Sequence, residues 1–181
     1  MPGKPSLARG GITRHSAATM IVYLLRHAEA EDTYPDPARR LTGKGRRSVE
    51  QLCDFLKKKE FADVSAVWHS PLVRAYETAT VFREALKIGA RLVETSGLRP
   101  EDEPALMARR LAEHEKGDLV LVGHNPNMEG LASHLFSGEE LRPFVEFKKT
   151  GLLCAERLFG RDARNPCGIW QLKYLLTPKL F

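Results

Sequence analysis

The stretch "VYLLRHAEAED" at residues 22–32 decides the fold, because a short apolar run stops there on Arg26 and His27. A run of this kind, without clean alternation of apolar and polar residues, is typical of a strand buried on both faces of a mainly parallel sheet. A charged pair at its end interrupts that burial. We therefore interpret the pair as the point where a strand opens onto a pocket.

Similar apolar runs recur along the chain and alternate with segments of helical spacing. The predicted strands cover residues 20–25, 64–68, 91–94 and 118–123, and the predicted helices cover residues 49–56, 72–86, 104–115 and 128–135. Two further strand-like runs, "GLLCAERLF" and "GIWQLKYLL", are joined through residues 160–168 and predict an antiparallel hairpin at one sheet edge. The expected fold is an α/β three-layer sandwich, with a mostly parallel central sheet and helices on both faces.

Length and composition fit one globular domain. With 181 residues, of which 43% are hydrophobic, the chain is long enough to bury a core without disulfides or structural metal ions. We expect this domain over residues 20–181, after a flexible basic tail over residues 1–19. The three cysteines form no close pair and favour neither a disulfide framework nor a zinc site, which fits a cytoplasmic location.

The charge and the apolar runs bear on possible partners. The tail holds Lys4, Arg9 and Arg14, and without these three cations the net charge of +5 falls to +2. Basic residues are interspersed with acids and no aromatic-basic platform is evident, so we expect no nucleic-acid partner. The chain has no apolar run of about 18 residues, so we expect no membrane span. The sequence does not indicate the oligomeric state.

Each of three predicted strands is followed by a motif that contains histidine or arginine: "RHAEA", "HSPLVRAYET" and "HNPNMEG". Right-handed crossovers bring the carboxyl ends of parallel strands to one edge of a sheet. The motifs therefore predict that Arg26, His27, Arg74 and His124 gather on one rim. Ser70-Pro71 and Asn125-Pro126 are each interpreted as the N-cap and first position of the following helix.

These residue types indicate phosphate chemistry. Two guanidinium groups and two helix N-termini would bind phosphate oxygens, and nearby positive charge keeps a histidine neutral near pH 7. His27 would then attack phosphorus and form a covalent phosphohistidine, while Arg26, Arg74 and His124 stabilise the charge on the equatorial oxygens. The scheme requires neither a metal nor a cofactor.

The stretches "LLRHAEA", "RRLTGKG", "HSPLVRAYET", "LVGHNPNMEGLASHL" and "WQL" resemble the histidine phosphatase superfamily in order and spacing. The resemblance runs over residues 20–181 and is closest to the small branch of SixA-like phosphohistidine phosphatases. It implies a phosphoglycerate mutase-like α/β sandwich and a nucleophile at His27, with Arg26, Arg74 and His124 completing the phosphate pocket. It also makes Arg39, in "RRLTGKG", a substrate-binding candidate.

Two features depart from that family, and one residue has two interpretations. The usual glycine after the Arg-His pair is Ala28 here, a mild change unless the backbone needs a positive φ. Larger members protonate the leaving group with a carboxylate from an insertion, and we expect this short chain to lack that insertion. Glu29, Asp102 and Glu103 are the candidates for this acid. Asn125 is counted among the substrate-binding candidates, although a helix cap is its simpler role.

The predicted substrate is phosphohistidine on a partner protein, such as a phosphotransfer or phosphocarrier domain. A phosphoramidate needs a strong acid less than a phosphate ester does, which suits a chain without an evident acid. Two alternatives stay open. The protein would instead hydrolyse small phosphate monoesters, or it would be a non-catalytic phosphate-binding module.

Overall fold

The computed structural model describes residues 20–114, 117–139 and 145–180; the tail predicted at residues 1–19 lies outside this range. The strands are β1 (Met20–Arg26), β2 (Val64–His69), β3 (Arg91–Glu94), β4 (Asp118–Gly123), β5 (Leu152–Phe159) and β6 (Ile169–Leu176). The α-helices are α1 (Gly43–Phe55), α2 (Val73–Leu86), α3 (Pro104–Glu113) and α4 (Asn127–Ser137). Two short 3₁₀ helices are η1 (Asp36–Ala38) and η2 (Lys58–Phe61).

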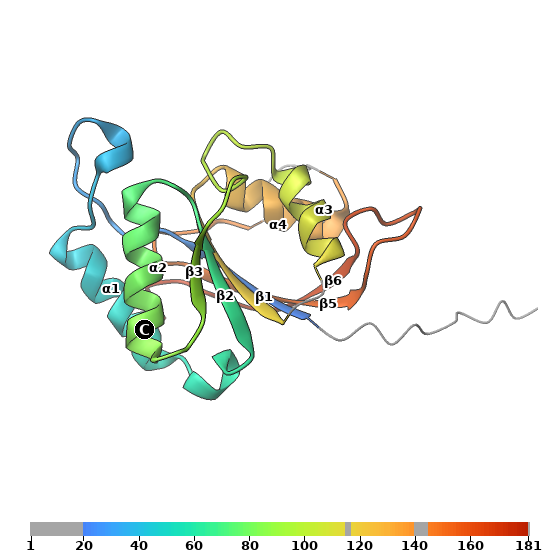
Figure 1. Cartoon of the computed structure of the whole chain (residues 1–181), viewed down its shortest axis with the longest axis horizontal. Helices are drawn as coiled ribbons and strands as arrows, with labels where there is room; N and C mark the ends of the chain where they lie inside the picture. The colour runs from blue at the N-terminus through green and yellow to red at the C-terminus, as the bar shows by residue number, and fades with distance from the viewer. Residues whose placement is uncertain (1–19, 115–116, 140–144, 181) are drawn as a thin grey trace, which may run out of the picture.

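The six strands form one mixed sheet in the order β3-β2-β4-β1-β5-β6. Its first four strands in that order are parallel, while β5 runs antiparallel to β1 and β6 runs antiparallel to β5. Helices α1 and α2 lie on one side of the sheet, and α3 and α4 lie on the other (Figure 1). The predicted α/β sandwich with an antiparallel hairpin at one edge is therefore confirmed.

The central strands alternate between two separate cores. In β1, Val22 and Leu24 belong to the core beneath α3 and α4, whereas Tyr23 and Leu25 belong to the core beneath α1 and α2. Because both faces are covered, nearly all side chains of β1 are buried, which explains the apolar run without alternation. Arg26 is the first charged residue of the strand and lies where the helices cease to cover both faces of the sheet.

The parallel strands end at nearly the same level. Arg26 of β1 is in register with Gly123 of β4, and His69 of β2 is in register with Val122 of β4. The backbone N–H of His27 also donates to the carbonyl of Gly123 at 2.9 Å. The residues that follow β1, β2 and β4 therefore emerge on one rim of the sheet.

Both predicted helix starts are wrong, that of α2 by two residues and that of α4 by one. Helix α2 begins at Val73 with Leu72 as its N-cap, because Ser70 Oγ accepts the N–H of Leu72 at 3.3 Å and closes a turn before the helix. Helix α4 begins at Asn127, and its N-cap, Pro126, makes no side-chain cap bond. The amide of Asn125 bonds away from the helix start, as described below.

Other expectations concern cysteines and membranes. Cys53, Cys154 and Cys167 are all free and buried. None of the described helices combines the length and the hydrophobicity that crossing a bilayer requires.

Candidate active site

His27 lies directly after β1 and is only 8% exposed. Its Nδ1 is 2.7 Å from the carbonyl oxygen of Ala28. Because a carbonyl only accepts, Nδ1 carries the proton and Nε2 keeps its lone pair. Burial lowers the pKa of His27 to about 4, and the nearby charges of Arg74 and Arg26 lower it as well. His27 is therefore neutral and nucleophilic at physiological pH.

His124 follows β4 and faces His27, with the ring centroids 4.7 Å apart. It is 1% exposed, and neither ring nitrogen has a hydrogen-bond partner among the described residues. Burial lowers its pKa to about 3, and the interactions with His27 and with the charge of Arg74 act in the same direction. A neutral imidazole has one N–H to donate, so His124 suits a phosphate oxygen beside His27.

Arg74 is a buried residue in the first turn of α2. Its Nη1 donates to the backbone oxygen of Asp36 at 3.0 Å and to Asp36 Oδ2 at 3.1 Å. Glu77, three residues further along α2, contacts Arg40 instead. Asp36 was missed, because a carboxylate in a connection gives no signal until the fold brings it against Arg74.

Arg26 is fixed by the segment that precedes β5. Its Nη1 donates to the carbonyl of Phe147 at 2.6 Å, while Nε is buried without a partner among the described residues. Asn125 Nδ2 donates to the same carbonyl at 3.1 Å and to Glu129 Oε1 at 2.6 Å. Glu129 Oε1 also accepts the N–H of Phe147 at 3.2 Å. Asn125 is thus placed beside Arg26, not at a helix cap.

Two threonines join the backbone around His27 to neighbouring elements. Thr78 Oγ1 accepts the N–H of Ala28 at 3.1 Å and donates to the carbonyl of Arg74 at 2.7 Å. Thr150 has a φ of 63°, a strained value for a β-branched residue, and its N–H reaches the carbonyl of Arg26 at 3.1 Å. Thr78 ends the motif "HSPLVRAYET" and Thr150 directly precedes "GLLCAERLF", but nothing in either stretch indicated these contacts.

Ala28 replaces the usual glycine without strain. Among the described residues, the only non-glycine positions with positive φ are Lys87 and Thr150. The glycine that this region does require is Gly45 in the first turn of α1, because a Cβ there would lie 2.0 Å from the carbonyl oxygen of Glu29. That close approach packs α1 against the segment after His27.

Arg39 contacts the site only through Asp36. Its Nη1 donates to Asp36 Oδ1 at 3.0 Å, and its Nε donates to the carbonyl of Glu31 at 2.5 Å. A further ion pair joins it to Asp32 at 3.5 Å. Arg39 and Arg74 therefore hold the two oxygens of one carboxylate.

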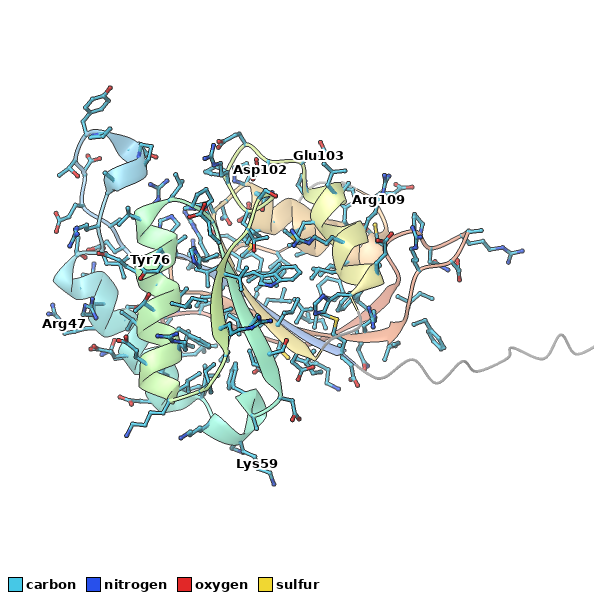
Figure 2. The ribbon with its side chains drawn as sticks, viewed as in Figure 1. Arg47, Lys59, Tyr76, Asp102, Glu103 and Arg109 are labelled. Carbon is cyan, nitrogen blue, oxygen red and sulfur yellow. The ribbon has the colours of Figure 1, made fainter. Side chains whose placement is uncertain are left out.

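Two of the three acid candidates, Glu29 and Asp102, are committed to other hydrogen bonds. Glu29 accepts hydrogen bonds from Lys44 and Thr42, and these hold the pKa of its carboxyl below the usual range. Asp102 Oδ2 accepts the N–H groups of Gly97 and Arg99, each at 2.9 Å. Figure 2 shows Asp102 and Glu103 on the connection that leads into α3, and Glu103 is exposed there without a side-chain cap bond.

The donors that remain around His27 suit a tetrahedral oxyanion. Arg26 Nε and one nitrogen of His124 are buried donors without a protein acceptor among the described residues. Within the part of the chain that the structure describes, Arg74 donates through Nη1 alone, which leaves Nη2 and Nε of the same guanidinium for oxygens. Within the described residues, no group of three or more histidine, cysteine or carboxylate side chains is arranged to hold a metal ion.

A mixed α/β sheet with His27, His124 and Arg74 at one rim is an arrangement that suits phosphate chemistry. Residues 22–100 match the family model described as histidine phosphatase superfamily (branch 1). No curated protein sequence matches the chain significantly.

Solved structures of similar fold include SixA proteins. The protein histidine phosphatase SixA complexed with tungstate is 21% identical, with a TM-score of 0.75 over 89% of this chain and 99% of that one. A protein described as a phosphohistidine phosphatase SixA from Agrobacterium tumefaciens is 25% identical, with a TM-score of 0.68 over 87% and 97%. The phosphoserine phosphatase of Entamoeba histolytica, at 15% identity, has a TM-score of 0.58 over 87% and 97%.

Proposed function

We propose that this protein removes phosphate from phosphohistidine on a partner protein, through a covalent phosphate on His27. The observation that carries the proposal is the bond from His27 Nδ1 to the carbonyl of Ala28, which leaves the lone pair on Nε2 of a ring that neighbours His124 and Arg74. The similarity to SixA proteins supports the substrate class.

In the first step, the lone pair of His27 Nε2 attacks phosphorus and the bond from phosphorus to the leaving nitrogen breaks, with its electron pair going to that nitrogen. Phospho-His27 then carries the phosphoryl group on Nε2 and a proton on Nδ1, so its ring is cationic. The carbonyl of Ala28 accepts that N–H and stabilises the cation. Arg26, Arg74 and His124 stabilise the charge on the phosphoryl oxygens.

In the second step, water attacks phosphorus and the bond to Nε2 breaks. Its electron pair returns to Nε2 and His27 regains the neutral tautomer it had at the start, because Nδ1 has kept its proton throughout. The proton of the attacking water leaves with the phosphate or the solvent. The cycle therefore needs no proton transfer at His27 itself.

The substrate class follows from the leaving group. A phosphohistidine ring protonated on its second nitrogen departs as neutral imidazole, so no carboxylic acid has to protonate it. An alkoxide leaving group does need such an acid, but Glu29 and Asp102 are committed to other bonds and Glu103 is exposed to solvent. The arrangement therefore favours phosphohistidine over alkyl phosphates.

The proposal is tested with a phosphohistidine-bearing phosphotransfer domain, a sugar phosphate and p-nitrophenyl phosphate as parallel substrates. We expect kcat/KM for the phosphoprotein to exceed that for the sugar phosphate by about 100-fold or more, the scale that general acid catalysis contributes. Turnover should persist in excess chelator, because the scheme includes no metal. Hydrolysis of the small esters alone would contradict the substrate assignment. Binding that survives in His27→Ala without turnover in the wild type would indicate a non-catalytic module.

A further inference from the structure

Asp36 is a carboxylate at the phosphate site that the reaction described above does not use. It begins η1, in the connection from β1 to α1, and its Oδ2 lies 3.1 Å from Nη1 of Arg74. The side chain is 56% exposed, so it stands at the open side of the site, whereas His27 is buried. An incoming side chain reaches Asp36 from solvent before it reaches His27.

The carboxylate of Asp36 is held in a fixed orientation. Arg39 Nη1 binds Oδ1 at 3.0 Å while Arg74 binds Oδ2. The hydrogen bond from Arg39 and the charge of Arg74 hold the pKa of Asp36 below its usual range, so the group is ionised. An ionised carboxylate accepts about four hydrogen bonds, so each oxygen has a lone pair left for another donor.

We propose that Asp36 determines specificity by accepting the N–H of the leaving imidazole of phosphohistidine. This inference rests on the proposed function and names the residue that selects the leaving group. Asp36 lies between the two cations on the open side of the site, where the side chain that carries the phosphate must enter.

The step balances without any further reactant. The second ring nitrogen of the substrate carries a proton and donates it as a hydrogen bond to Asp36. The bond from phosphorus to the first nitrogen breaks, its electron pair goes to that nitrogen, and the ring leaves as neutral imidazole with the proton still on the second nitrogen. Asp36 thus stabilises the cationic ring before the bond breaks and gains no proton itself.

The same carboxylate opposes phosphate esters. An ester oxygen gains negative charge as it leaves, and a fixed negative charge nearby raises the barrier to its departure. Asp36 also occupies one nitrogen of Arg74, which weakens the field that the guanidinium directs at phosphate. The preference for phosphohistidine is then the sum of an attraction and a repulsion.

The test compares the wild type with Asp36→Asn, which keeps the shape of the side chain and removes its charge. Free phosphohistidine and p-nitrophenyl phosphate serve as substrates, and inhibition by tungstate reports whether the phosphate pocket is intact. We expect kcat/KM for phosphohistidine to fall by about 10-fold or more while that for p-nitrophenyl phosphate rises, as removal of one charged hydrogen bond predicts. Asp32→Asn is the matched control, because Asp32 is a fully exposed carboxylate of the same connection that reaches only Arg39.

The possible outcomes distinguish a failure of this inference from a failure of the proposed function. If the wild type turns over phosphohistidine but Asp36→Asn slows both substrates equally, Asp36 only orients Arg74 and the inference is wrong. If both substrates speed up equally, Asp36 merely competes with phosphate for Arg74, and the inference is again wrong. If the wild type hydrolyses p-nitrophenyl phosphate but not phosphohistidine, the proposed function itself fails. A change of the same size in Asp32→Asn would show a general charge effect and overturn the role of Asp36.

Discussion

At the scale of single residues, the chemistry depends on which nitrogen of His27 carries its proton. The sequence placed His27 beside two arginines and predicted a neutral ring. The residue types and their positions at strand ends were enough for this prediction. The bond to the carbonyl of Ala28 was beyond the sequence, since any residue at position 28 supplies a carbonyl and only the fold decides where it points. The role of Asp36 was not predicted, because only the fold decides which groups its carboxylate contacts.

The titration of His27 tests this local account. Because burial lowers its pKa to about 4, we expect the imidazole signals of His27 in an NMR titration to show the neutral Nδ1–H tautomer from pH 8 down to about pH 5. A midpoint near the ordinary value of 6.5 would contradict the burial and the charge environment described here.

The same shift links His27 to stability. The folded-state pKa of His27 lies below the unfolded value of about 6.5. The contribution of neutral His27 to the free energy of unfolding is therefore fully present above pH 6.5 and is lost as pH falls towards 4. Urea unfolding at pH 7 and pH 5 measures this loss, which is about 2 kcal/mol for one such group over that interval. His27→Gln should show a smaller loss than the wild type.

At the scale of elements, the order of strands and helices followed from apolar patterning, whereas the helix starts did not. Ser70-Pro71 and Asn125-Pro126 both carry the residues of an N-cap and first turn, yet α2 begins two residues later than predicted and α4 one residue later. In each case the polar side chain has a better partner, the N–H of Leu72 for Ser70 and the carbonyl of Phe147 for Asn125. Local propensity gives way to contacts that only the assembled fold offers.

Helix α2 and the end of β1 are coupled through one hydroxyl, that of Thr78. Thr78→Val leaves the buried N–H of Ala28 without its acceptor, which costs about 1–3 kcal/mol and releases the Ala28 carbonyl that holds His27. We expect kcat to fall by about 10-fold with little change in KM, as one displaced catalytic group predicts.

Thr78→Ser is the matched control, because serine keeps the hydroxyl and loses only a methyl group. It should retain most of kcat, and thermal unfolding of both variants reports whether the fold survives. Equal loss of kcat in the serine and valine variants would assign the effect to packing and contradict the role of the hydroxyl.

At the scale of the whole molecule, the sequence predicted the site because the sheet is mostly parallel. Parallel strands end on one rim, so residues from "RHAEA", "HSPLVRAYET" and "HNPNMEG" meet although they are far apart in the chain. Arg26, His27, Arg74 and His124 are predictable in this way from motif position alone. Side-chain contacts from connections, such as that of Asp36, depend on loop conformation and are not.

The central claim is that His27 carries the phosphoryl group during turnover. The most direct measurement is a rapid quench of the enzyme with a radiolabelled phosphohistidine protein, followed by mapping of the bound label. We predict label on His27 that is stable to alkali and labile to acid, as expected for a phosphorylated imidazole, and no label in His27→Ala. Label on another residue, or turnover at the wild-type rate in His27→Ala, would contradict the account.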